Sequence, residues 1–446
     1  MERELDRRDS RRRAPRLRGP GGRGRTPARR PSPAPPAVTH PATPQPPDPV
    51  RLRPLLFTPW YRPDTGGVAS VAERLHEGLR RSGVDSRLVV FRGGRDLEPH
   101  AELPGVWSLE IPTAFVSSRR PRAWLGALLR GPGTIRRLVR FIREREVNCL
   151  VVVYPIDHAW IFPLLRRFSG ARLFPSFHGG DAKRIPDLSA RRRWIFRRLV
   201  AASDGIIVCA EHLEEKTRER CPEAEAPIRV IANAVDVDHF VPPPADPSRS
   251  DGPRTLVHVS NFFRMKRTLD IVEGFALADL PPGTRLVMVG DGDDRLATQA
   301  RAEELGVADR VEFPGFREDI RPYLQQADVF VLASDSEGAP LVLLEAMACG
   351  TPWVSTPWGA AAEIPSGECG LVVPARDPAR LAAALSEIMA DDARRLQMGA
   401  RARELAVANY GSRAWIRRHV EFMGGTLPDA EPVPDAPPST PDPSAT

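Results

Sequence analysis

Two glutamates in the segment 337–345, EGAPLVLLE, have the type and spacing of a pair that grips a ligand. Glu337 stands in a polar loop after an apolar run, where its carboxylate can accept two hydrogen bonds from vicinal hydroxyls. Glu345 lies about one and a half turns into an otherwise apolar helix, where a carboxylate is costly unless it is paired. Ribose hydroxyls would pair it. The apolar surroundings disfavour the alternative, a place on an exposed helix face.

The start of that helix is a candidate phosphate site. Pro340 suits a first helical position, because its missing amide would have no partner there. The amides of the next residues, Leu341 and Val342, would then be free to bind an anion. The segment therefore predicts a site for a phosphorylated, hydroxyl-rich ligand.

A basic loop, SNFFRMKR, lies between the apolar run at 255 and an amphipathic helix. Its cations, Arg264, Lys266 and Arg267, would neutralise a diphosphate. Basic loop residues are usually only solvated. This loop, however, directly follows a predicted strand, and ligands bind beyond the carboxyl ends of parallel strands. We therefore favour the binding role.

A glycine turn, Gly66 and Gly67, separates the apolar run at 55 from a helix with Val68, Val71 and Leu75 on one face. Such a turn at a helix start favours an anion. Two glycines there can also serve only tight packing, and the sequence leaves both readings open.

A second glycine pair separates His178 from Asp181, in FPSFHGGD, just past another predicted strand. A lone histidine is more often structural. Because His-Gly-Gly-Asp stands at the carboxyl end of a strand, we favour contact of His178 with a sugar hydroxyl or a developing charge.

Short apolar runs that alternate with helical patterns predict an α/β protein with two doubly wound, Rossmann-like domains facing a central cleft. The expected organisation is a disordered Arg/Pro-rich tail (1–50), an N-terminal domain (51–240), a linker (241–254), a C-terminal domain (255–427) and an acidic Pro-rich tail (428–446). The last helix of 255–427 can also pack back on the N-terminal domain.

Composition limits the partners. The net charge of +7 is carried by residues 1–50, with twelve Arg against five acids, so a nucleic-acid role would rest on that tail alone and we expect none. For the tail, a solvated segment without a role is favoured over a polybasic binding arm.

Five cysteines without a C-x-x-C pair argue against disulfides and zinc. No apolar run is long enough to span a bilayer, and residues 1–50 show no signal-peptide pattern. We therefore expect a cytoplasmic protein.

Taken together, these motifs resemble glycosyltransferase family 4, the retaining enzymes of GT-B fold, over about residues 55–420. The signs are GG at 66, HGGD at 178, NAVDVDHF at 233, the Lys266 loop, VGDG at 289, and the two glutamates followed by AMACGTP. The order and spacing of these motifs are more specific than any one of them. The pair Asp236 and Asp238 is interpreted as a turn and not as a metal motif.

The resemblance implies transfer of a sugar from a nucleotide-diphosphate donor, without a metal, with retention of the α configuration. His178 and Glu337 would lie nearest the reacting sugar as catalytic candidates. The family usually has Gly-Arg where this chain has Ser260-Asn261, so Arg264 becomes the candidate partner of Lys266 on the diphosphate. The implied donor-binding residues are Gly66, Gly67, Arg264, Lys266, Gly290, Glu337, Gly338, Pro340, Leu341, Val342 and Glu345.

The acceptor is left open as a small molecule, a glycan or a lipid-linked sugar, in glycan or glycolipid biosynthesis. Basic amphipathic runs at 133–146 and 190–200 suggest peripheral contact with the inner membrane face as a hypothesis, while core packing of both helices is favoured. Alternatives are an N-acetylglucosaminyl-malate synthase-like transferase, a sugar-nucleotide epimerase or hydrolase of the same fold, and a non-catalytic sugar-nucleotide sensor.

Overall fold

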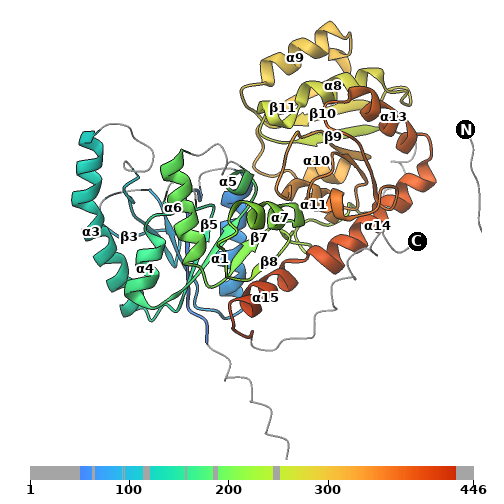
Figure 1. The fold of residues 1–446 in the computed structure, drawn as a ribbon. Helices are drawn as coiled ribbons and strands as arrows, with labels where there is room; N and C mark the ends of the chain where they lie inside the picture. The colour runs from blue at the N-terminus through green and yellow to red at the C-terminus, as the bar shows by residue number, and fades with distance from the viewer. Residues whose placement is uncertain are drawn as a thin grey trace, which may run out of the picture. The chain divides into compact units, whose positions relative to one another are not determined.

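A computed structural model describes residues 51–62, 66–92, 94, 96–113, 121–155, 158–183, 189–244 and 252–427, with the side chains of 121–127 and 182–183 left out. The predictions for the two tails, 1–50 and 428–446, lie outside these residues. Two largely parallel sheets with helices on both faces confirm the predicted architecture (Figure 1).

The first sheet has the order β3-β4-β2-β1-β5-β6-β7-β8. Its strands are β1 (Pro54–Thr58), β2 (Arg87–Val90), β3 (Glu98–Pro99), β4 (Val106–Ser108), β5 (Cys149–Val153), β6 (Arg172–Phe177), β7 (Ile206–Val208) and β8 (Ile228–Val230). Its helices are α1 (Gly67–Arg81), α3 (Pro121–Glu144), α4 (Phe162–Ser169), α5 (Gly180–Lys183), α6 (Ala190–Ala201) and α7 (Glu211–Arg220).

The second sheet has the order β11-β10-β9-β12-β13-β14. Its strands are β9 (Thr255–Val259), β10 (Arg285–Val289), β11 (Val311–Gly315), β12 (Val329–Leu332), β13 (Trp353–Ser355) and β14 (Gly370–Val372). The helices of this half of the chain are η2 (Arg264–Lys266), α8 (Thr268–Leu277), α9 (Arg295–Glu304), η3 (Ala308–Arg310), α10 (Arg321–Gln326), α11 (Leu341–Ala348), α12 (Ala360–Glu363), α13 (Pro378–Met389) and α14 (Asp392–Tyr410), followed by α15 (Ser412–Phe422), which packs on the first sheet.

The sheets are covered on both faces because their strands are apolar at successive positions. In β1, Leu55 and Phe57 pack with α3, α4 and α6, whereas Leu56 packs with α1 and α15. Alternate residues of a strand point to opposite faces, so a continuous apolar run needs helices on each side. The sequence does not predict β3 and β4, since these short, partly exposed strands contain no apolar run.

Both sheets have a switch point, where the strand order reverses beside the first strand. It lies between β1 and β5 in the first sheet and between β9 and β12 in the second. Ligands of doubly wound folds bind outside the carboxyl ends of the strands at such points. The loops after these strands therefore hold the functional candidates.

The chain crosses between the sheets twice, and the crossings touch. Val235 forms an isolated parallel bridge with Gly411, and its amide donates to the Tyr410 carbonyl at 2.9 Å. After the return crossing, Trp415 and Ile416 of α15 join the core cluster of α1 in the first sheet. Among the described residues, no helix is both long and apolar enough to span a bilayer.

Candidate functional site

A cavity of about 720 Å³ lies beyond the carboxyl ends of the strands at both switch points. Its walls come from the loops after β1, β5 and β6 on one side and after β9, β10 and β12 on the other. The predicted residues that line it are Gly66, Gly67, His178, Lys266, Gly290, Glu337, Gly338, Pro340, Leu341, Val342 and Glu345. Eleven of the twelve predicted site residues are thus brought together. Arg264 is not among them.

The two glycines of the turn after β1 differ in what their positions require. Gly66 has φ 129, a conformation that L side chains rarely adopt. Gly67 has no heavy atom within 4 Å of where a Cβ would stand, so packing does not require glycine there. No side chain caps the first turn of α1. Gly66 therefore shapes the turn, and Gly67 leaves room beside a helix start.

His178 follows β6 on the same wall. The Asp181 carboxylate fixes its backbone by accepting hydrogen bonds from the amides of His178 and Gly179, so Asp181 shapes the turn. The His178 Nε2 lies 2.9 Å from the Ser176 hydroxyl. Burial lowers the pKa of His178 to about 3, with a smaller contribution from His419. His178 is therefore neutral near pH 7 and cannot supply a positive charge.

Three further histidines, the interior histidines, are buried away from the cavity lining: His76, His258 and His419. Burial lowers the pKa of each to about 4. They too are neutral near pH 7, and their effect is on stability.

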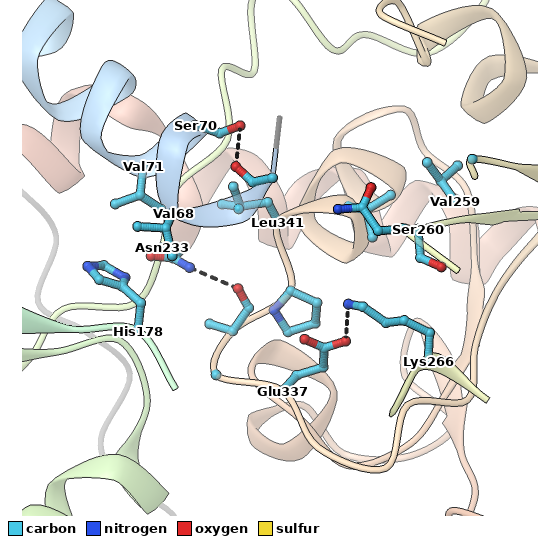
Figure 2. Close-up of a pocket in the computed structure, with 18 of the residues that line it drawn as sticks. Val68, Ser70, Val71, His178, Asn233, Val259, Ser260, Lys266, Glu337 and Leu341 are labelled. Atoms are coloured by element: carbon cyan, nitrogen blue, oxygen red, sulfur yellow. Dashed lines mark hydrogen bonds and ion pairs between the residues drawn. The ribbon is translucent and has the colours of Figure 1, made fainter. Parts of the chain in front are cut away.

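On the opposite wall, Lys266 and Glu337 form an ion pair at 2.5 Å (Figure 2). The Ser334 hydroxyl donates to the same Glu337 oxygen at 2.7 Å. Side-chain exposures of 20% and 14% show that the pair is largely shielded from bulk water, although both residues line the cavity. The pair places a cation and a carboxylate side by side at the cavity wall.

Arg264 does not line the cavity. It begins the 3-10 turn that ends at Lys266, and its side chain is exposed. The next two residues of the same turn, Met265 and Lys266, do line the cavity. Arg267 is held by Asp270 at 2.7 Å. The arginine that does line the cavity is Arg317, after β11, which the sequence prediction missed.

The helix start at α11 differs from the prediction by one residue, because Pro340 is the extended residue before the helix and Leu341 takes the first helical position. Pro340 is the residue before the first turn, no side chain caps that turn, and Leu341 and Val342 line the cavity. The initial amides of a helix lack intrahelical partners and favour an anion. In Figure 2, Leu341 and the Lys266–Glu337 pair lie on one side and Val68, Val71 and His178 on the other.

Glu345 is buried, which excludes the exposed-face alternative, but its partner differs from the expected one. Arg74 of α1 forms an ion pair with its Oε1. The sequence prediction that ribose hydroxyls would be the pairing group is thus incomplete. A protein cation, 271 positions away, already compensates the charge.

Gly338 and Gly290 line the cavity, and close backbone contacts also require glycine at both positions. A Cβ at Gly338 would stand 2.2 Å from the His178 carbonyl oxygen, and one at Gly290 would stand 1.8 Å from the Ser260 carbonyl oxygen. Gly290 also has φ 134. The glycine at 338 lets the two walls approach, backbone against backbone.

The structure adds Tyr154 and Asn233 to the site. Tyr154 follows β5 at the switch point with φ 58, an uncommon conformation for a non-glycine residue. The Asn233 amide donates to the Ala339 carbonyl at 2.8 Å, across the cavity mouth (Figure 2). Tyr154 could have been found as the residue after a core strand, and Asn233 opens the NAVDVDHF motif.

The remaining sequence candidates have structural roles. The Asp236 carboxylate accepts hydrogen bonds from the amides of Asp238 and His239, both at 3.1 Å, as expected for a turn. In the part of the chain that the structure describes, no group of three or more His, Cys, Asp or Glu could hold a metal ion. The apolar faces of α3 and α6 pack into the cores of the first sheet, as the favoured alternative predicted.

Comparisons with known proteins agree with this geometry. Residues 65–239 match the model described as Glycosyltransferase Family 4, and residues 244–405 match Glycosyl transferases group 1. The chain is 26% identical over 304 residues to N-acetyl-alpha-D-glucosaminyl L-malate synthase of Bacillus anthracis, over 66% of this chain and 78% of that protein. It is 27% identical over 398 residues to GDP-mannose-dependent alpha-(1-6)-phosphatidylinositol monomannoside mannosyltransferase of Mycolicibacterium smegmatis, over 83% and 98%. Anabaena Alr3699/HepE in complex with UDP superposes with a TM-score of 0.66 at 17% identity, over 83% and 99%.

Proposed function

This chain belongs to glycosyltransferase family 4 and is a glycosyltransferase that uses a nucleotide sugar, and we propose that it transfers the sugar to an acceptor hydroxyl with retention of the anomeric configuration. The observation that carries the proposal is the convergence of two helix starts, after Gly66 and after Pro340, with Lys266 on one cavity. Each of these groups favours a phosphate. Together they would hold the diphosphate of a nucleotide sugar.

The carboxylates of the cavity support retention by way of the donor's own phosphate. Glu337 and Glu345 are its lining acids, and each is paired with a cation, Lys266 or Arg74. Both carboxylates are thus engaged by protein cations, and the lowered pKa of His178 disfavours it as an acid. The acceptor hydroxyl attacks the anomeric carbon on the face that the diphosphate leaves. Its proton passes to a phosphate oxygen, the bond from carbon to phosphate oxygen breaks, and the nucleoside diphosphate departs.

Charge neutralisation by the protein supports transfer without a metal ion. Lys266 and the two helix starts, with Arg317 at the cavity edge, can together compensate a diphosphate. We expect turnover to persist in excess EDTA. Restoration of lost turnover by Mg²⁺ or Mn²⁺ would contradict this part of the proposal.

The experiment begins with a thermal-shift panel of UDP, GDP and ADP sugars, because the names of the relatives mention both GDP-mannose and UDP. The stabilising donor is then incubated with L-malate and with phosphatidylinositol monomannoside, acceptors suggested by the names of two relatives. NMR of the product should show the anomeric configuration of the donor. An inverted product would refute retention.

The same experiment distinguishes the proposal from three alternatives. A transferase like N-acetylglucosaminyl-malate synthase would use L-malate and exclude the lipid. A hydrolase or epimerase of this fold would release free or epimerised sugar without an acceptor. A non-catalytic sensor would bind the donor without turnover. The presence of Lys266, Glu337 and Glu345 in one cavity argues against a sensor.

We propose glycan or glycolipid biosynthesis as the setting, in the cytoplasm or at the inner membrane face. Since the apolar faces of α3 and α6 are in the core, a membrane contact through the described parts of these two helices would use the exposed Leu128, Leu129 and Trp194. We expect flotation with anionic vesicles to weaken in the variant Leu128→Ser/Leu129→Ser. Equal flotation with neutral vesicles would contradict an electrostatic contact.

A further inference from the structure

A buried ion pair joins helices from the two walls of the cavity. Arg74 of α1 contacts Glu345 of α11, and the side chains are 22% and 8% exposed. The Arg74 Nη1 also donates to the Ala234 carbonyl at 2.8 Å, so one guanidinium binds both α11 and the segment that crosses between the sheets. Figure 1 shows α1 on the first sheet and α11 on the second.

Folding stability alone does not explain this pair. Replacing a buried ion pair by apolar groups is often neutral or stabilising, because two charges lose their hydration. An apolar residue at 345 would suit the buried neighbours Leu343, Leu344 and Met347. A carboxylate that lines the cavity instead, paired by a cation from another helix, points to a role toward the ligand.

The pair controls the two phosphate-facing helix starts at once. Arg74 lies about two turns beyond Gly67, and Glu345 lies about one turn beyond Leu341. Both helices begin at the cavity. Tying Arg74 to Glu345 therefore fixes the spacing between the helix starts. The contact uses the Oε1 of Glu345, and none of the described residues pairs with its Oε2.

We infer that Arg74 is a positioning residue for the donor, an inference that rests on the proposed function. By binding Oε1, it holds the Glu345 carboxylate so that Oε2 can accept a hydroxyl of the donor's nucleoside. By bridging Glu345 and Ala234, it holds α1 and α11 at the separation that a diphosphate spans. Arg74 does not line the cavity, so it would act on the donor through Glu345 and Ala234.

Arginine is needed because two acceptors must be bound in fixed directions. The planar guanidinium presents separate nitrogens to the Ala234 carbonyl and the Glu345 carboxylate, whereas a lysine ammonium is a point charge on a flexible stem. Arg74→Lys should retain the charge and lose the geometry. Its donor KM is expected between those of the wild type and Arg74→Met.

The experiment compares Arg74→Met, Arg74→Lys, Glu345→Gln and the double variant Arg74→Met/Glu345→Gln by steady-state kinetics and donor titration. Arg81→Met is the matched control, because Arg81 stands on the same helix with an exposed ion pair to Glu77. Arg74→Met should raise the donor KM by roughly 5- to 150-fold, the usual range for coupled sites. The acceptor KM should not change, and kcat should fall less than the donor KM rises. The double variant should be no worse than the poorer single variant, since the two residues act as a unit.

A merely structural role would lower the melting temperature and the active fraction while leaving both KM values unchanged. Wild-type donor KM in Arg74→Met, or losses that multiply in the double variant, would overturn the inference. If Arg74→Met does not fold, Arg74→Gln and Arg74→Lys decide the same question. Failure of the proposed function is separate, because it would appear as a wild-type protein that turns over no nucleotide sugar.

Discussion

The substitution Gly338→Ala tests whether the close approach of the two cavity walls is needed for transfer. The new Cβ would stand 2.2 Å from the His178 carbonyl oxygen and 2.8 Å from its carbonyl carbon. Contacts under 3.0 Å are essentially never seen, and backbone atoms cannot rotate aside. The walls must therefore separate by about 0.8 Å or more. Gly338 does not have a positive φ, so alanine adds no backbone strain and the contact alone is tested.

A misplacement near 1 Å costs about a hundredfold in rate when reacting groups must be aligned, which is about 2.7 kcal/mol of transition-state stabilisation. Overpacking in a closed core costs about 1–3 kcal/mol, but a cleft can open to relieve it. We therefore expect kcat/KM for donor turnover to fall about a hundredfold with a melting temperature lowered by only a few degrees.

The control is Gly252→Ala, because no atom lies within 4 Å of the Cβ position at Gly252 and its φ is not in the left-handed region. This variant should retain wild-type kcat/KM. Gly338→Ala with kcat/KM within twofold of the wild type would refute the reasoning, since it would mean that the walls need not meet during transfer.

The other predictions concern the phosphate site, the ion pair and acid stability. Gly67→Ala should leave the melting temperature unchanged, because nothing lies within 4 Å of the new Cβ, but should raise the donor KM if phosphate approaches the turn; an unchanged donor KM would assign Gly67 no ligand role. Lys266→Ala and Glu337→Ala should each lower turnover by about a hundredfold or more while melting cooperatively, and wild-type turnover in both would remove the site assignment. The interior histidines have folded pKa values near 4, below the ordinary 6.5, so the unfolded chain binds more protons below pH 6.5. Their stabilising contribution is present above pH 6.5 and is lost as the pH falls toward 4, which urea midpoints at pH 7 and pH 5 should show as a lower value at pH 5.

The sequence by itself determined the features that depend on local pattern. The apolar runs predicted the core strands of both sheets, because a strand buried on both faces must be apolar at successive positions. The proline at 340 marked the start of α11, and the glycines at 66 and 67 marked the turn into α1. These features follow from backbone geometry within a few residues, which the residue types themselves dictate.

Only the tertiary structure decided which side chains share the cavity. Arg74 reaches Glu345 from 271 positions away, and no local pattern on α1 marks one arginine for that contact. Arg264 is exposed outside the cavity although Lys266 of the same turn lines it, and the basic composition of the loop does not distinguish the two. Asn233 meets Ala339 only because the crossing segment passes the start of α11. Such contacts depend on how two separately patterned domains pack, so their partners are fixed by three-dimensional proximity and not by spacing along the chain.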